Sequence, residues 1–279
     1  MGQLISSEKS SNSISDKILK LENFISTYSK VIVAYSGGVD SSLVAFISTK
    51  ILGKDNARII LAKSPSLNSR ELKYARELAN KNDWNYSEIE TNEFYNEDYR
   101  KNNSLRCFFC KFELYSCLDK ISKESSIEVV FNGTNIDDLG DYRPGNKAAE
   151  QIKVVSPLLE CNISKSDVRD IALFYGLDNW SKPAQPCLAS RVPYGIEITM
   201  NILNQIEYAE NYLHDLGFQK FRVRNHGSVA RIELSESDFK ILLNKKLRVD
   251  IDKKFRKLGF NFVSLDLRGF KSGSLNSEI

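Results

Sequence analysis

The sequence predicts an α/β protein: a parallel sheet with helices on both faces, followed by a smaller C-terminal α+β domain. Up to about residue 175, short apolar runs alternate with segments whose apolar residues recur at helical spacing. Beyond residue 198 the order changes to a helix, two adjacent strands, further helices and a last strand. The chain of 279 residues is long enough for both parts to bury a core.

The expected elements follow from this periodicity. A first helix begins at Asp16, because apolar residues recur at helical spacing from Ile18 to Ile25. The strands of the first part are expected at 31–35, 57–62, 84–89, 128–132 and 153–156, and its helices at 40–52, 69–81, 111–122 and 165–175. The second part is expected to contain a helix at 199–215, strands at 220–225 and 228–234, helices within 236–257, and a strand at 261–267.

Composition predicts the boundaries between three segments. Residues 1–15 are expected to form a flexible tail, since they are polar and rich in serine. The main domain is expected at 16–189 and the C-terminal domain at 190–279. Between them, residues 178–198 hold three of the six prolines and predict a long structured loop.

Charge and hydropathy narrow the possible partners. No apolar run approaches the roughly 18 residues of a spanning helix, so no membrane partner is expected. The net charge is +3, but residues 218–279 carry +7. This basic segment indicates an anionic partner such as phosphate, carboxylate or nucleic acid, or else a solvated basic face.

A glycine-rich turn gives the strongest functional signal. Residues 36–42 read SGGVDSS and lie between an apolar strand and a helix. Two glycines allow a tight turn, and the helix start offers free N–H groups and a positive dipole end to an anion. The motif lacks the lysine of a Walker loop and the spacing of a dinucleotide fingerprint. Without further evidence it could be an ordinary turn with an N-cap.

SGGVDSS resembles the PP-loop of the ATP pyrophosphatase family at every defined position. The resemblance implies an adenine-nucleotide α-hydrolase-like, Rossmann-like fold that cleaves ATP to AMP and pyrophosphate. Paired aspartates in the run 133–138 (GTNIDD) could hold Mg²⁺ on the phosphates, or could form a solvated turn. The ATP-binding residues implied are Ser36, Gly37, Gly38, Asp40, Ser41, Ser42, Ser64, Gly133, Thr134 and Asp137, with Asp40 and Ser41 also catalytic.

Five cysteines, at 107, 110, 117, 161 and 187, predict a reducing compartment, hence the cytoplasm. Their number is odd, and no apolar leader precedes them. Cys107 and Cys110 form a C-x-x-C motif at a helix start, which favours thiolates for ligation or attack. Cys187 lies in the proline-rich loop, and three thiolates leave one coordination position open. We assign no role to Cys117 or Cys161.

Seven motifs together resemble the LarE family, in order along nearly the whole chain. They are SGGVDSS, RCFFCK (106–111), GTNIDDLGDYRPG (133–145), QPCLASRVPYG (185–195), RVRNHG (222–227), ARIEL (230–234) and LDLRGF (265–270). The family comprises ATP-dependent sulfur transferases that make the thiocarboxylates of the nickel-pincer cofactor. The resemblance implies that a carboxylate of a pyridinium dicarboxylate mononucleotide is adenylylated and that sulfur then replaces AMP.

Two branches of this family differ in their sulfur source. One sacrifices a single cysteine, which becomes dehydroalanine, and Cys187 matches that position. The other holds a [4Fe-4S] cluster on three cysteines, and the open iron carries a hydrosulfide formed from sulfide or another sulfur donor. Cys107, Cys110 and Cys187 match this trio, so the cluster branch is favoured; the sacrificial mechanism would leave the C-x-x-C unexplained.

The resemblance also implies substrate-binding residues and a homo-oligomer. Arg222 and Arg224 alternate along one strand and therefore share a face, as a phosphate clamp requires. The full set implied for the substrate is Arg143, Arg191, Glu210, Arg222 and Arg224; for each arginine the alternative is a salt bridge.

Two other functions compete with this one. A tRNA thiolase also joins a PP-loop to three cysteines, and the basic segment could bind a phosphate backbone. The sequence offers no extra zinc-binding cysteine pairs, so nucleic acid is the less favoured partner. A nucleotide-binding or redox-sensing protein without catalysis is disfavoured by the intact Asp40, Ser41 and Asp137.

Overall fold

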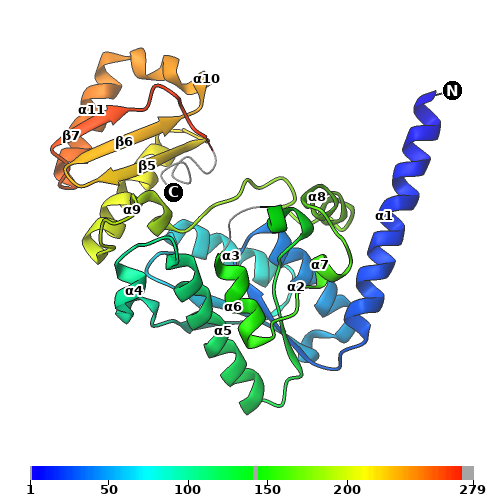
Figure 1. The fold of residues 1–279 in the computed structure, drawn as a ribbon. Coiled ribbons are helices and arrows are strands. Elements are labelled where there is room, and N and C mark those ends of the chain that lie inside the picture. Colours follow the sequence, from blue (N-terminus) through cyan, green and yellow to red (C-terminus); the bar gives the residue numbers. More distant parts are fainter. Residues whose placement is uncertain (1, 141–143, 272–279) are drawn as a thin grey trace. The chain divides into compact units, whose positions relative to one another are not determined.

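The structure, a computed structural model, describes residues 2–140 and 144–271 (Figure 1). The chain divides into two compact units, each built from several segments. Unit 1 comprises Met1–Ser64, Glu71–Glu93 and Cys107–Gln185, and unit 2 comprises Pro65–Arg70, Phe94–Arg106 and Pro186–Ile279.

Unit 1 is built on a four-stranded parallel sheet in the order β3-β2-β1-β4. In register, Val33 of the central strand pairs with Ile59 on one side and Phe131 on the other. The strands are β1 (Val31–Tyr35), β2 (Ala57–Lys63), β3 (Asn85–Glu90) and β4 (Val129–Phe131). The principal helices are α1 (Gly2–Ser26), α2 (Val39–Leu52), α3 (Ser69–Lys81), α5 (Arg106–Glu124), α6 (Pro144–Ile152), α7 (Pro157–Glu160) and α8 (Lys165–Phe174).

Helices cover both faces of this sheet, and the predicted α/β class is confirmed. Alternation along β1 sends Ile32 to one face, where it packs with Tyr115 and Leu118 of α5 and Ala148 of α6. On the other side α2 contacts β1, and α1 and α8 pack against α2. The carboxyl ends of β1, β2 and β4 meet at one edge, where ligands of open α/β sheets bind.

Three boundaries differ from the sequence expectation. The first helix begins at Gly2 rather than Asp16, since no proline or glycine interrupts 3–26; the flexibility of 1–15 stays a prediction. The helix carrying Cys107 begins at Arg106 rather than at 111. Only an isolated bridge, between Val155 and Phe131, forms where a fifth strand was expected at 153–156.

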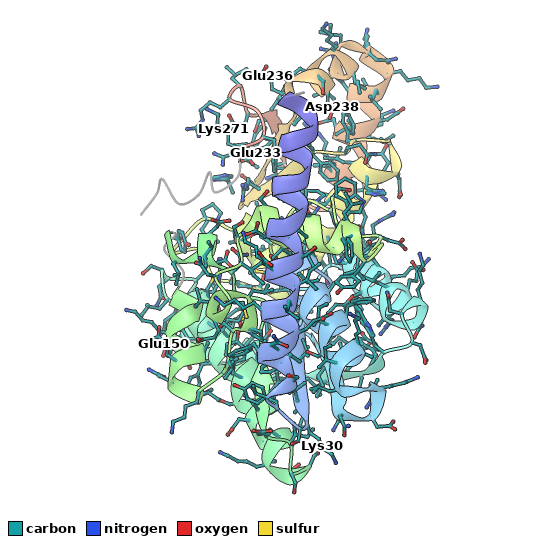
Figure 2. All side chains as sticks on the ribbon, turned by 90° about the vertical axis from the view of Figure 1, so that its right-hand side faces the viewer. Lys30, Glu150, Glu233, Glu236, Asp238 and Lys271 are labelled. Atoms are coloured by element: carbon teal, nitrogen blue, oxygen red, sulfur yellow. The ribbon has the colours of Figure 1, made fainter. Side chains whose placement is uncertain are left out.

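Unit 2 contains the smaller α+β part, as predicted. Its three-stranded sheet has the order β5-β6-β7, with β5 and β6 antiparallel and β6 and β7 parallel. Figure 2 shows Glu233 near the end of β6, and Glu236 and Asp238 in α10 just after it. The elements are α4 (Glu97–Arg100), the 3₁₀ turn η4 (Leu188–Arg191), α9 (Met200–Asp215), β5 (Phe221–His226), β6 (Val229–Leu234), α10 (Glu236–Phe239), the 3₁₀ turn η5 (Lys240–Leu243), α11 (Lys245–Lys257) and β7 (Phe262–Leu265).

The core of unit 2 lies between one face of this sheet and two helices. Phe221 and Val223 of β5 pack with Leu213 of α9 and with Ile251 and Phe255 of α11. Residues 222 and 224 therefore point to the opposite face. Within the described residues, no helix has both the length and the apolar character that a membrane crossing requires.

Candidate active site

The SGGVDSS turn joins β1 to α2 and cannot accommodate a side chain at its first glycine. Gly37 is buried and has a φ of 75°, and a Cβ placed there would lie 2.9 Å from the Cβ of Ala75. Gly38 is the N-cap of α2 and makes no side-chain capping bond. The first N–H groups of a helix have no acceptor within it, so the turn presents amide donors at the sheet edge.

Serine hydroxyls hold this turn in shape. Ser41 Oγ donates to Gly38 O at 3.1 Å and accepts from the Ser36 amide at 3.1 Å. Ser42 Oγ donates to Gly38 O at 2.9 Å and accepts from Asn179 Nδ2 at 2.8 Å. Ser42 is fully buried, whereas Ser36 is exposed. The two inner serines therefore stabilise the loop, and Ser36 is the hydroxyl most open to a ligand.

The loop that follows β4 lies directly against the start of α2 at Gly133. A Cβ at Gly133 would lie 2.7 Å from the Ser41 amide nitrogen and 3.0 Å from the Asp40 carbonyl carbon. Thr134 follows Gly133, and Ser64 follows the last residue of β2. The ten predicted ATP-binding residues therefore lie at the same edge of the sheet; their roles stay predictions.

Two residues that the sequence did not single out contact Asp40. Asn135 Nδ2 donates to Asp40 Oδ1 at 3.0 Å, and Lys165 Nζ forms an ion pair with Asp40 Oδ2. The Lys165 amide donates to Asp137 Oδ2 at 2.7 Å, which joins the two predicted aspartates through one residue. Lys165 is the first residue of α8, and the Ser164 capping box that fixes this helix start is visible in the sequence.

Cys107 lies in the first turn of α5 and Cys110 follows directly after that turn, so both are near a helix start, as predicted, and both belong to unit 1. Cys107 is exposed and Cys110 is half-buried. The ring of Phe108 stacks on that of Phe112, with centroids 5.7 Å apart. Searched over the described residues, the structure brings together no group of three His, Cys, Asp or Glu side chains able to hold a metal ion.

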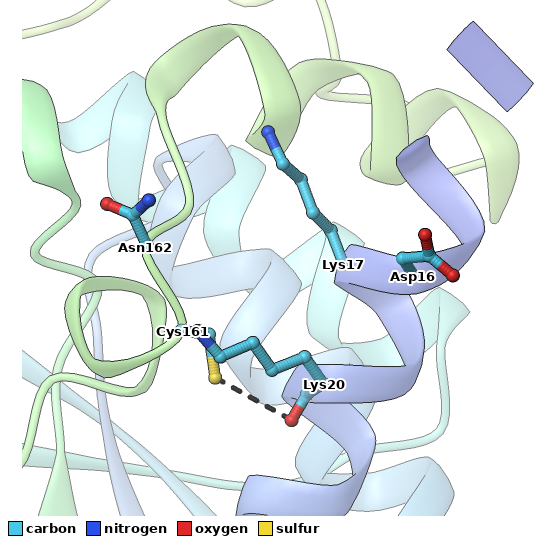
Figure 3. Close-up of a pocket in the computed structure, with 5 residues that line it drawn as sticks. All are labelled: Asp16, Lys17, Lys20, Cys161 and Asn162. Atoms are coloured by element: carbon cyan, nitrogen blue, oxygen red, sulfur yellow. Dashed lines mark hydrogen bonds between the residues drawn. The ribbon is translucent and has the colours of Figure 1, made fainter. Parts of the chain in front are cut away.

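Cys117 and Cys161 differ from these two in environment. Burial, followed by the charge of Glu113, raises the pKa of Cys117. Burial also raises the pKa of Cys161, whose Sγ donates to Lys20 O at 3.7 Å. Cys161 lines a pocket of about 330 Å³ with Asp16, Lys17, Lys20 and Asn162 (Figure 3). Neither thiol is in an environment that promotes thiolate formation.

Cys187 belongs to unit 2, where it is exposed and precedes η4 as its N-cap. The remaining described candidates of unit 2 are buried. Arg191 forms a bidentate ion pair with Glu210, at 3.0 and 3.1 Å, and Arg224 forms one with Glu233, at 3.0 Å for both bonds. The salt bridges that the sequence left as an alternative therefore form at Arg191 and Arg224, and Arg143 lies outside the described residues.

Arg222 contacts the backbone of its own strand and an aromatic ring. Its Nη1 donates to Phe221 O at 2.7 Å, and its guanidinium lies 5.0 Å from the centroid of the Phe270 ring. Burial, followed by the charge of Arg191, lowers the pKa of Arg222 to about 10. The charges of Glu210 and Glu233 act in the opposite direction and raise this pKa, because a nearby negative charge favours the charged guanidinium.

Comparisons with known proteins identify the family of this chain. Residues 9–106 match a family model described as NAD synthase. The chain is 37% identical over 254 residues to the pyridinium-3,5-bisthiocarboxylic acid mononucleotide synthase of Lactiplantibacillus plantarum, covering 90% of both chains. It is also 42% identical to an uncharacterized protein of Synechocystis, covering 94% of this chain and 98% of that one. An uncharacterized protein of Methanocaldococcus jannaschii is 32% identical over 92% of this chain. The chain therefore belongs to the LarE family of ATP-dependent sulfurtransferases, which are built on a PP-loop domain that uses ATP and Mg²⁺.

Proposed function

We propose that this protein converts carboxylates of a pyridinium dicarboxylate mononucleotide into thiocarboxylates, in the cytoplasm, during biosynthesis of a nickel-pincer cofactor. The observation that carries the proposal is the match, over 90% of both chains, to a relative named as a pyridinium-3,5-bisthiocarboxylic acid mononucleotide synthase. We propose a homo-oligomer as the working form.

The first step of the proposed reaction activates the carboxylate. A substrate carboxylate oxygen attacks the α-phosphorus of ATP, the bond to the pyrophosphate oxygen breaks, and an acyl-adenylate forms. The amides at the start of α2 and the hydroxyl of Ser36 would bind the leaving pyrophosphate. Asp40 and Asp137 would hold Mg²⁺, which neutralises phosphate charge.

The second step replaces AMP with sulfur. The three thiols of Cys107, Cys110 and Cys187 suit a [4Fe-4S] cluster with one open iron, because none forms a disulfide and two of them are exposed. Such a cluster would supply the sulfur atom, replenished by sulfide or another donor. The alternative is the sacrificial mechanism, in which exposed Cys187 gives up its own sulfur. The cysteine variants distinguish the two mechanisms.

Substrate binding is proposed at the basic residues of unit 2, with Arg222 on the substrate phosphate. Arg222→Ala should raise the KM for the mononucleotide about 30- to 150-fold, the effect of losing a charged bidentate contact worth about 2–3 kcal/mol. The KM for ATP should change far less, because the ATP residues are in unit 1. Steady-state kinetics with each substrate varied would measure both constants, with Arg268→Ala, an exposed residue paired with Asp266, as the control. An equal rise in both KM values would refute the assignment.

Pyrophosphate release distinguishes the competing functions. We expect release from ATP to depend on the pyridinium dicarboxylate mononucleotide and to be unaffected by added tRNA. A coupled phosphate assay with either acceptor, or with none, measures this dependence. Release that required tRNA would favour a tRNA thiolase, and no release with any acceptor would favour a binding protein without catalysis.

A further inference from the structure

Three buried arginines donate to the backbone of the turn that carries Cys187. Each uses its Nη1 atom to contact carbonyl oxygens between residues 186 and 190. Arg191 donates to Pro186 O at 2.5 Å and to Cys187 O at 3.0 Å, Arg106 donates to Ala189 O at 2.9 Å, and Arg224 donates to Ser190 O at 2.7 Å. We call Arg106, Arg191 and Arg224 the arginine clamp; all three belong to unit 2, as does the turn.

The clamp is itself fixed by acidic and polar partners. Arg191 and Arg224 use their remaining nitrogens on Glu210 and Glu233. Arg106 Nη1 also donates to Asn102 Oδ1 at 2.6 Å. The three arginines are 5%, 2% and 6% exposed, in chain order, so solvent does not compete for their donors. A guanidinium has five N–H donors in a rigid fork, which lets one residue bind a carboxylate and a carbonyl at once.

Cys187 therefore combines a fixed backbone with an exposed side chain. Its carbonyl accepts from Arg191 Nη1, from the Ser190 amide at 2.9 Å and from Ser190 Oγ at 2.7 Å. The next amide, of Leu188, donates to Ser66 O at 2.8 Å. Leu188 and Ala189 are buried and the Ser190 hydroxyl is bonded to the Cys187 carbonyl, whereas the Cys187 side chain is exposed, which is the arrangement of a positioned reactive group.

We infer that Arg106 and Arg191 are positioning residues that hold Cys187 at a fixed place for sulfur transfer. The consequence for catalysis rests on the role of Cys187 in the proposed function. The resemblance instead implies that Arg191 binds the substrate. In the structure all three guanidinium nitrogens of Arg191 have acceptors within unit 2: Nε and Nη2 bind Glu210, and Nη1 binds the turn. A substrate carboxylate would have to displace one of these contacts.

Lysine variants of the clamp test the inference. Arg191→Lys and Arg106→Lys keep the charge, but an ammonium cannot span both the partner and the carbonyls. Hydrogen exchange measured by mass spectrometry should be about 10- to 100-fold faster at the Leu188, Ser190 and Val192 amides, the effect of losing charged hydrogen bonds. In Arg191→Lys the KM for the mononucleotide should stay within about 2-fold while kcat for sulfur transfer falls about 10-fold or more.

Matched controls separate this result from a general loss of stability. Arg231→Lys changes another arginine of unit 2, one that pairs with Glu233 and Asp266, and it should leave exchange at these three amides unchanged. Ser190→Ala is a milder variant for the case in which the lysine variants do not fold. It removes the hydroxyl that donates to Cys187 O and should also speed exchange at the Ser190 amide.

Two outcomes would overturn the inference. One is a large rise in the KM for the mononucleotide in Arg191→Lys with unchanged exchange, which would make Arg191 a substrate ligand. The other is unchanged exchange and unchanged kcat in Ser190→Ala and in the lysine variants that fold. The exchange readout does not depend on sulfur chemistry. Full sulfur transfer by Cys187→Ala would instead refute the proposed role of Cys187 in sulfur transfer. The exchange data would still show whether the arginines hold the turn, so the two failures can be distinguished.

Discussion

Alanine at Cys107, Cys110 or Cys187 is expected to abolish iron binding and sulfur transfer. Two thiolates rarely retain a cluster that needs three, so each single variant should fall from about four irons per chain to near zero. The protein should be purified without oxygen, supplied with iron and sulfide, and analysed for iron content and visible absorbance. With added sulfide, the wild-type protein should complete many turnovers.

Cys117→Ala and Cys161→Ala are the matched controls. Burial raises the pKa of both thiols, and Cys161 donates a hydrogen bond to Lys20, so neither thiol is poised to ligate iron. Both variants should keep the iron and the activity. The sacrificial mechanism predicts the opposite: at most one turnover, and a loss of about 34 Da at Cys187 as dehydroalanine forms. That mass change, with activity surviving in Cys107→Ala, would contradict the cluster.

Asp40→Ala is expected to lower pyrophosphate release about 100-fold or more without unfolding the protein. The change removes the acceptor of Asn135 and of Lys165, and with it the carboxylate proposed to hold Mg²⁺. Ser41→Ala should have a similar effect, because its hydroxyl ties the Ser36 amide to Gly38. A pyrophosphate assay, with circular dichroism to verify folding, would measure both.

The control for this pair is Asp55→Ala. Asp55 lies in the short turn before β2, at the amino end of the strands and so at the opposite edge of the sheet. Its replacement should leave pyrophosphate release near the wild-type level. Near-normal release by Asp40→Ala or Ser41→Ala would show that the SGGVDSS loop does not bind the phosphates.

Local patterns were sufficient to predict most of the fold. The strand at Val31–Tyr35 and the helix at Ser69–Lys81 have the predicted bounds. The strand is a short apolar run, and the helix is an amphipathic segment with a clear start. The predicted start of the first helix, at Asp16, was wrong. The residues before it carry no apolar stripe, so no sequence pattern indicated that they are helical. The sequence likewise could not tell that 153–156 would form only a single bridge, since sheet pairing depends on the neighbouring strand.

The candidate site was predictable only where its residues form a motif. The SGGVDSS loop is one such motif, and its residues occur together in unit 1. Lys165 reaches Asp40 across 125 positions, and Asn135 reaches it across 95, separations that leave no periodic signal. For the same reason Arg191 and Glu210 were both predicted as substrate ligands, although in the structure they pair with each other. Arg106 lies beside the C-x-x-C motif, but no local sequence pattern predicted its hydrogen bond to Ala189 O.

Gly133 places a limit on how mutational data from this site can be interpreted. Because the loop after β4 touches the first turn of α2 at this residue, any added side chain must move the backbone whose amides are proposed to bind the anion. Loss of activity at Gly133 would therefore combine a folding defect with a binding defect, and a single assay could not separate them. The Asp40 carboxylate contacts the side chains of Asn135 and Lys165, so its removal adds no atoms against that backbone. The contribution of this loop to ATP binding is therefore best measured with side-chain variants such as Asp40→Ala. Variants of the glycines report instead on the backbone conformation of the loop.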